Sequence, residues 1–167
     1  MLELPKSRVA AVQTSPVFLD TERTIDKACA LIAEAARHGA QLVAFPEVFV
    51  SAYPYWNWLL NPVDGSVWFD RLYRSAIEVP GPEVRRLCAV AREHAVTLVI
   101  GVNERDPRRV GTLFNTNLVI GPDGELLGRH RKLVERVPHI SFNGPYVASM
   151  GRRILYITER AVFTLRD

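Results

Sequence analysis

The chain has 167 residues, of which 48% are hydrophobic and 23% charged, and its formal net charge is +3 at pH 7. No apolar run approaches the ~18 residues of a membrane span, so we expect no membrane partner. Short basic clusters occur at 105–109, 129–132 and 152–153, but they lack the interleaved aromatic residues of a nucleic-acid surface, so we expect no nucleic-acid partner. The N-terminal stretch MLELPKSRVAAVQTS lacks the basic start and long apolar segment of a signal peptide. Together with the presence of two cysteines, this predicts a cytoplasmic protein.

The first part of the chain predicts a β–α–β unit. Residues 8–14, RVAAVQT, are typical of a buried strand, and residues 41–45, QLVAF, predict a second one. Between them, Asp20 or Thr21 is a suitable N-cap and Gly39 a suitable residue just past a helix end. The helix has one apolar face, made of Ile25, Ala28, Cys29, Ile32, Ala35 and Ala36. Strands joined by such a crossover helix are expected to be neighbours and parallel.

The rest of the chain predicts further strands and helices of a mixed α/β fold. An aromatic loop at 46–66 is followed by a short helix near 67–77 and by a helix from Pro82 to Ala95 with an apolar stripe. Residues 97–103 predict a strand. FNTNLVIG and GELLGRHRK predict two more, joined by a hairpin turn at Pro122-Asp123-Gly124. We expect a mixed sheet with helices on one face.

Two charged residues stand at the ends of predicted strands. Glu47 follows the strand at 41–45, and Lys132 closes the second strand of the hairpin. Side chains at strand ends of α/β folds converge on ligands, so both are candidates for one pocket. A carboxylate beside a lysine can serve as a general base with a cation that stabilises a developing oxyanion. From spacing alone, an ordinary structural ion pair is the simpler interpretation.

Residues 8–133 resemble the nitrilase branch of the carbon–nitrogen hydrolase superfamily. The resemblance lies in AAVQTSPVFLD, in FPEVFVSAYPYWNW, in GVNERD and in the hairpin ending GRHRKL. FPEVFVSAYPYW is closer to nitrilases proper than to the amidase and carbamylase branches. The resemblance implies part of an α-β-β-α sandwich, a homo-oligomer, and no metal or organic cofactor. The implied reaction converts a small nitrile into a carboxylic acid and ammonia through a covalent thioimidate and then a thioester.

The same resemblance implies roles for individual residues. Glu47 matches the general base, and Lys132 matches the lysine that steadies the tetrahedral intermediate. The loop aromatics at 53–58, including Tyr53 and Trp56, would shape the entrance to the nitrile pocket.

Other polar and aromatic residues near this block have two interpretations each. His130 shares the side of Lys132 on an alternating strand, so we expect it in the pocket wall and not as a metal ligand. Trp56, Trp58 and Trp68 either line the substrate site or pack within a lid. Asn103 and Glu104 are interpreted as solvated loop polarity, with a supporting role at the site as the alternative.

The implied chemistry also needs a thiolate downstream of the lysine, and no cysteine follows Lys132 in these 167 residues. Cys29 and Cys88 lie on apolar faces of predicted helices, where a thiol is unreactive. Glu135 stands in LVERVPH, a context that does not match the second glutamate of the family. We therefore predict a catalytically incomplete hydrolase. The alternatives are a non-enzymatic ligand-binding or assembly module, and a hydrolase that uses Cys29 or Cys88.

The C-terminal segment at 135–167 resembles a different family. Its ISFNG and GRRILYITERAVF stretches are similar to a fragment of the family I CoA-transferases. ILYIT and AVFTL predict strands on either side of a polar turn. We therefore expect two segments: the N-terminal part of a nitrilase-like domain at 1–134, and a short CoA-transferase-like tail of foreign origin at 135–167.

Overall fold

The computed structural model describes residues 7–132, 147–150 and 153–156. The elements are β1 (Val9–Ala11), α1 (Thr21–Arg37), β2 (Leu42–Ala44), the 3-10 helix η1 (Tyr55–Trp58), α2 (Ser66–Ser75), α3 (Pro82–Glu93), β3 (Thr97–Arg105), β4 (Leu113–Ile120), β5 (Leu126–Arg131), β6 (Val147–Met150) and β7 (Arg153–Tyr156). Up to β5, the strands and α-helices occur in the predicted order. The segments η1 and β6 were not predicted, and the strand expected at AVFTL lies outside the described residues.

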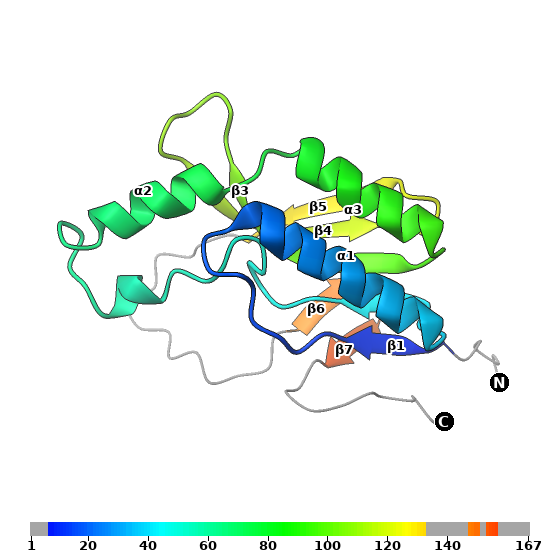
Figure 1. Cartoon of the computed structure of the whole chain (residues 1–167). Helices are drawn as coiled ribbons and strands as arrows, with labels where there is room; N and C mark the ends of the chain where they lie inside the picture. The colour runs from blue at the N-terminus through cyan, green and yellow to red at the C-terminus, as the bar shows by residue number, and fades with distance from the viewer. Residues whose placement is uncertain (1–6, 133–146, 151–152, 157–167) are drawn as a thin grey trace.

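One mixed sheet joins the first five strands in the order β1-β2-β3-β4-β5 (Figure 1). β1, β2 and β3 are parallel, whereas β4 and β5 are antiparallel to their neighbours. The predicted crossover and hairpin are therefore both confirmed. The hairpin turn closes as its sequence requires, because Gly124 adopts φ +80° and the Asp123 carboxylate accepts a hydrogen bond from the Glu125 N–H at 3.0 Å.

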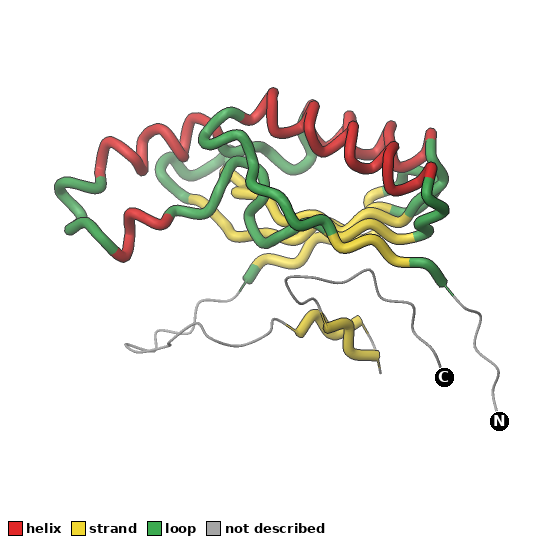
Figure 2. The backbone as a smooth tube through the Cα atoms, turned by 60° about the horizontal axis from the view of Figure 1, so that its bottom comes forward, coloured by secondary structure: helices red, strands yellow, loops and turns green. Residues whose placement is uncertain are grey.

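Helices α1 and α3 cover one face of this sheet (Figure 2). The core between the layers includes Ile25 and Ile32 of α1, Leu87 of α3, and Leu98 and Ile100 of β3, all fully buried. Burying each such side chain stabilises the fold by about 1.5–3 kcal/mol. The N-cap of α1 is Asp20, whose side chain accepts from the Arg23 N–H at 3.0 Å; of the two candidates that the sequence offers, Thr21 is the first residue of the helix.

Two of the element ends that differ from the prediction have clear structural reasons. α3 ends at Glu93 and not at Ala95, because Ala95 adopts φ +50°, which no α-helix contains. β3 runs on to Arg105, two residues past the predicted end at 103, because it stays paired with β4 as far as Leu113.

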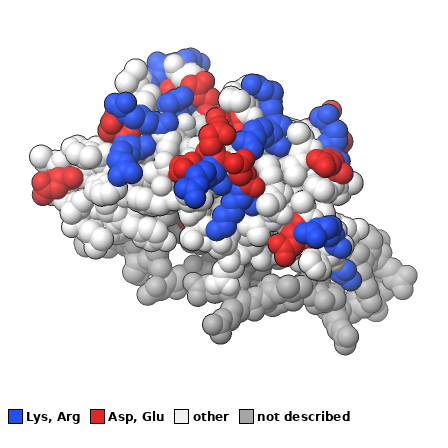
Figure 3. Space-filling model, in the orientation of Figure 1, with Lys and Arg blue, Asp and Glu red and all other residues white. Residues whose placement is uncertain are grey.

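Acidic and basic side chains are interspersed on the helix-covered side of the molecule (Figure 3). Arg86 of α3 donates to Glu22 of α1 at 3.0 Å and also to Asp26 on the same helix. These exposed pairs contribute little each, but both link the two helices that form the outer layer.

The segment η1–α2 extends beyond the edge of the helix layer (Figure 1). Several large apolar side chains are exposed there: Tyr55, Trp58, Leu59, Leu60, Val63, Val67 and Phe69. β6 and β7 form a separate antiparallel pair. None of the helices in the described part of the chain combines the length and the apolar character needed to cross a bilayer.

Candidate active site

The loop that carries Glu47 is attached to β3 on both sides of that residue. Before it, the Phe45 N–H donates to Val99 O at 2.8 Å; after it, the Val50 N–H donates to Gly101 O at 3.1 Å. The chain between these two attachments bulges out of the sheet, and Val48 adopts φ +42° there. A β-branched residue in the left-handed region is strained, and such strain is typical of a segment whose position is fixed by its surroundings.

Gly101 makes room for this bulge. A β-carbon at position 101 would lie 2.4 Å from Val48 N and 2.6 Å from Pro46 O, distances that no side chain tolerates. Glycine is therefore required where the loop backbone crosses β3. The loop is held farther along by Asn103, which is 5% exposed and donates from Nδ2 to Ala52 O at 2.9 Å.

Glu47 is joined to Lys132 by a direct ion pair. Lys132 Nζ donates to Glu47 Oε1 at 2.8 Å, and Asn115 Nδ2 donates to the same oxygen at 2.5 Å. The Lys132 N–H also donates to Asn115 O at 2.8 Å, so β4 and the end of β5 present both donors together. The Glu47 and Lys132 side chains are 20% and 36% exposed. The structure thus brings Glu47 and Lys132 together and adds Asn115, which sequence analysis missed.

A cleft of about 380 Å³ opens beside Glu47. The described residues that line it are Thr14, Ser15, Pro16, Phe18, Pro46, Glu47, Val48, Phe49, Ala52, Tyr53 and Tyr55. Glu47 is the only one of these with a charged side chain, and most of the others are apolar or aromatic. A carboxylate paired with an ammonium group at the wall of such a cleft can accept a proton from a bound nucleophile and stabilise negative charge that develops on a substrate.

The predicted substrate-binding residues lie in different places. Tyr53 lines the cleft, and its ring packs on that of Tyr55 with centroids 4.9 Å apart. Trp56 does not line the cleft; it is 7% exposed and packs between Phe18 and Trp68, at centroid distances of 6.2 and 6.0 Å. For Trp56 this favours the lid-packing alternative.

His130 is exposed on β5 and lies opposite Asn117 of β4. Because strand side chains alternate, this register places it on the same face as Lys132 and Asn115. It does not belong to the residues that line the cleft.

The two cysteines lie in the helix layer. Cys29 of α1 and Cys88 of α3 are partly buried and pack against the core. Burial raises the pKa of both thiols, which keeps them protonated near neutral pH. Asn115 and Lys132, in contrast, lie on the sheet face opposite this core, because the alternating residues of β4, Leu118 and Ile120, point into it. No group of three or more metal-ligating side chains occurs in the described residues.

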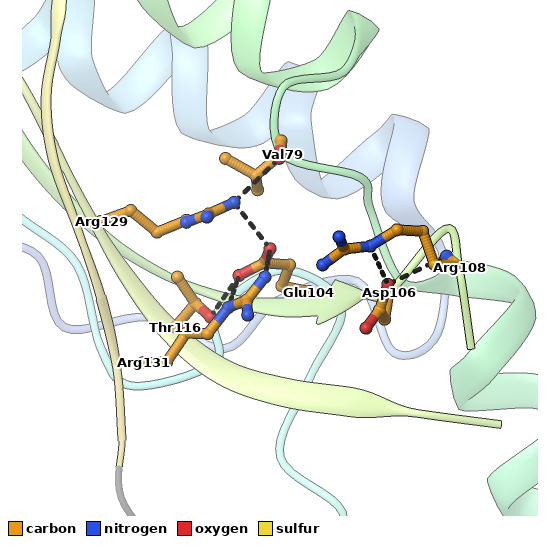
Figure 4. Close-up of polar contacts among 7 residues, drawn as sticks. All are labelled: Val79, Glu104, Asp106, Arg108, Thr116, Arg129 and Arg131. Atoms are coloured by element: carbon orange, nitrogen blue, oxygen red, sulfur yellow. Dashed lines mark hydrogen bonds and ion pairs between the residues drawn. The ribbon is translucent and has the colours of Figure 1, made fainter. Parts of the chain in front are cut away.

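A buried carboxylate lies on the helix-covered face of the sheet (Figure 4). Glu104 is 1% exposed and accepts from Thr116 Oγ1 at 2.8 Å, from Arg129 Nη1 at 3.0 Å, and from Arg131 Nη2 at 2.6 Å and Nε at 3.0 Å. Burial alone would raise the pKa of Glu104, but the hydrogen bonds from Arg131 and Thr116 and the charge of Arg129 outweigh it and lower that pKa. The interpretation of Asn103 and Glu104 as solvated loop polarity is therefore wrong, because both are buried in β3.

The comparisons with known proteins fit this geometry. Residues 8–157 match the model of the carbon-nitrogen hydrolase family. The chain belongs to this family. It is 45% identical over 142 residues to an aliphatic nitrilase of Rhodococcus rhodochrous, covering 82% of this chain and 38% of the relative. It is 40% identical over 154 residues to an arylacetonitrilase of Aspergillus niger, covering 92% of this chain and 43% of the relative.

Solved structures share the fold. Nit3 of Saccharomyces cerevisiae, a member of branch 10 of the nitrilase superfamily, superposes with a TM-score of 0.61 at 26% identity, covering 77% of this chain and 45% of that one. The chain spans about two fifths of the length of the Rhodococcus and Aspergillus relatives. The family match continues to residue 157, past the boundary expected near 134, so that boundary remains a prediction.

Proposed function

We propose that the Glu47–Lys132 pair is the base-and-lysine part of a nitrilase-type site that binds a small neutral nitrile. The observation that carries the proposal is the 2.8 Å contact between Lys132 Nζ and Glu47 Oε1 at a largely apolar cleft. The relatives support the substrate class, because those at 45% and 40% identity are an aliphatic nitrilase and an arylacetonitrilase. The aromatic rings of Tyr53 and Tyr55 suit an aliphatic or arylaliphatic chain. No metal or organic cofactor enters the proposal.

In the complete reaction a nitrile and two waters give a carboxylic acid and ammonia. Glu47 would take the proton of the attacking thiol and later that of the attacking water, and the Lys132 ammonium group would stabilise the charge of each tetrahedral intermediate. In a mutant of a solved neighbour, an amidase from Nesterenkonia sp., acrylamide has undergone Michael addition at the active site cysteine. Here Cys29 and Cys88 lie in the helix layer. We propose that these 167 residues alone bind the nitrile but do not turn it over.

Two measurements on the purified chain test this. Ammonia release is measured with isobutyronitrile and phenylacetonitrile, with Glu47→Gln in parallel. Binding of the same nitriles is followed by amide chemical shifts, with Tyr53→Ala as the test variant. Trp58→Ala is the matched control, because Trp58 is 62% exposed and does not line the cleft.

We expect no ammonia, and shifts near Tyr53 and Asn115 that weaken in Tyr53→Ala only. Ammonia that disappears in Glu47→Gln would show a complete site and overturn the proposed incompleteness. Absence of shifts with both nitriles would overturn the nitrile site and leave the assembly alternative.

The exposed apolar segment from Tyr55 to Phe69 favours self-association as a second property of this chain. Leu59 and Val63 are each 80% exposed, which is costly on a surface that stays in water. We propose that a second copy of the chain covers this segment. Light scattering during size-exclusion chromatography should report a dimer or larger species for the native chain and a monomer for Leu59→Ser/Val63→Ser. A monomeric native chain would overturn the proposal.

We also propose that the segment at 135–167 is a separate tail joined to the family domain near residue 134, in a cytoplasmic protein. Its resemblance to family I CoA-transferases is the support. Limited proteolysis should then cut first near 133–135 and leave a resistant fragment that ends there. A resistant fragment that ends near 157, where the family match stops, would contradict it.

A further inference from the structure

The buried Glu104 network lies directly behind the candidate active site. Arg131 and Lys132 are consecutive residues at the end of β5, so their side chains leave opposite faces of the sheet. Arg131 turns to the helix-covered face and binds Glu104 through Nε and Nη2. Lys132 turns to the other face and binds Glu47. One short piece of backbone therefore carries both contacts.

This piece of backbone has a neighbour on one side only in the described sheet. β5 is the last strand of the order β1-β2-β3-β4-β5 and pairs with β4. Its end is attached through the Lys132 N–H, which donates to Asn115 O. Side-chain contacts to the neighbouring strands can therefore help to fix the direction of its last side chains.

Glu104 supplies such contacts twice. Arg129 and Arg131 are two residues apart on β5, so both reach the same carboxylate from one face. Glu104 itself belongs to the central strand β3 and is 1% exposed. The guanidinium of Arg131 also lies over the ring of Phe114 on β4, with 3.8 Å between its central carbon and the ring centroid. The end of β5 is thus tied to β3 and β4 by side chains as well as by backbone.

We propose that Glu104 is a positioning residue: by holding Arg131 and Arg129 on one face of the sheet, it fixes the direction in which Lys132 leaves the other face toward Glu47. Glu104 touches neither the cleft nor Glu47, so its effect on the site passes through β5. The proposal depends on the proposed function only for the catalytic role of Lys132.

The reactivity of the Lys132 amine is a direct measure of its pairing. The sequence contains lysine at positions 6, 27 and 132 alone, so acetylation with sulfo-NHS-acetate can be followed at each site by mass spectrometry of the full chain. An amine held by a carboxylate reacts more slowly than a released one. Lys27, which donates to Ser15 O at 2.7 Å on another part of the chain, is the internal reference.

The test variants are Glu104→Gln and Arg131→Gln. The second leaves Glu104 with Arg129 and Thr116, so it serves if the first does not fold. The matched control is Glu78→Gln, which removes the ion pair between Glu78 and Arg105. Arg105 also belongs to β3, but it pairs with Leu113 of β4 and its side chain does not bind β5 in the described structure. Each variant is also made in the Glu47→Gln background.

We expect Lys132 to be acetylated about threefold faster in both test variants, the change expected from loss of one ion pair, with Lys27 unchanged and no effect in Glu78→Gln. In the Glu47→Gln background the two test substitutions should add nothing, because the pair on which they act is already gone. An unchanged Lys132 rate, a parallel rise at Lys27, or a rise that persists in the Glu47→Gln background would overturn the proposal. None of these readouts requires turnover, so they stand whether or not the chain binds or hydrolyses nitriles.

Discussion

Gly101 lies against the backbone of Glu47: a β-carbon at position 101 would stand 2.8 Å from the Glu47 carbonyl carbon. The loop that presents the carboxylate can therefore cross β3 only where β3 has no side chain. The adjacent Val48 N and Pro46 O would be still closer, at 2.4 and 2.6 Å. Backbone atoms on three consecutive residues would have to move together to admit a methyl group.

Substitution Gly101→Ala should therefore destabilise the chain by about 1–3 kcal/mol, the usual cost of overpacking a close contact. It should also displace Glu47 from Lys132 and raise the acetylation rate of Lys132. Urea unfolding measures the first effect and mass spectrometry the second.

Gly128→Ala is the matched control, because position 128 lies in a strand of the same sheet and a β-carbon there meets nothing within 4 Å. This control should be neutral or stabilise the chain by up to about 1 kcal/mol. Equal stability of the two variants would contradict the close approach at Gly101.

Glu104 should make the stability of the chain depend on acid pH. The pKa of Glu104 is lower in the folded chain than in the unfolded one, because the hydrogen bonds from Arg131 and Thr116 and the charge of Arg129 outweigh the opposite effect of burial. A carboxylate of this kind stabilises the fold at pH values above its unfolded pKa, and the contribution is lost as the pH falls through the folded value. The free energy of unfolding should therefore decrease below about pH 4–5.

The variant Glu104→Gln isolates this contribution. Near pH 7 it should be less stable by about 2 kcal/mol, because two arginines lose a charged hydrogen-bond acceptor. At pH 3 the difference from the native chain should shrink, because the carboxylate of the unfolded chain then binds a proton more readily than that of the folded chain. Urea unfolding at both pH values checks this, with Glu78→Gln as the surface control. A difference that is the same at pH 7 and pH 3 would argue against the carboxylate charge as the cause.

The parts of the fold that the sequence predicts are those with local causes. Asp20 caps α1 through its own side chain, and Gly124 adopts the positive φ that the hairpin turn needs. The crossover between β1 and β2 follows from chain order and from the handedness of such units. Glu47 and Lys132 are candidates through family resemblance and strand-end position, and the structure brings their side chains into contact.

The parts that were missed depend on the register of strands distant in sequence. Asn115 reaches Glu47 only because it lies beside Lys132 on β4. Glu104 was assigned to a loop because the predicted strand stopped at 103, whereas pairing with β4 carries β3 on to Arg105. One sequence signal could have indicated Glu104. Arg129 and Arg131 are two residues apart on a predicted strand, so both side chains lie on one face, where two neighbouring cations favour a carboxylate partner.

The position of Trp56 leads to a prediction that separates packing from substrate binding. Trp56 is 7% exposed, and its indole Nε1 is buried without a hydrogen-bond partner among the described residues. Trp56→Ala should lower the free energy of unfolding by about 3 kcal/mol through loss of packing. Trp56→Phe should cost less than about 1.5 kcal/mol, because it keeps most of the ring and removes an unsatisfied donor.

Binding of phenylacetonitrile, followed by amide chemical shifts, distinguishes the two roles. It should be unchanged in Trp56→Phe and weaker in Tyr53→Ala, because Tyr53 lines the cleft. Loss of binding in a folded Trp56→Phe variant would show that the indole contacts substrate after all.

The two thiols provide the test of an unconventional nucleophile. Burial raises the pKa of Cys29 and of Cys88, so little thiolate is present at pH 7.5 and both side chains are partly shielded in the helix layer. We expect iodoacetamide to label the native chain at least about tenfold more slowly than the urea-unfolded chain. The single variants Cys29→Ser and Cys88→Ser assign each rate to its residue. Rapid labelling of one native thiol, together with ammonia release that the labelling abolishes, would instead make that cysteine the nucleophile. Slow labelling of both thiols would show that neither cysteine supplies the thiolate. We expect this result, because Cys29 and Cys88 pack against the core on the helix-covered side of the sheet, whereas Lys132 lies on the opposite face.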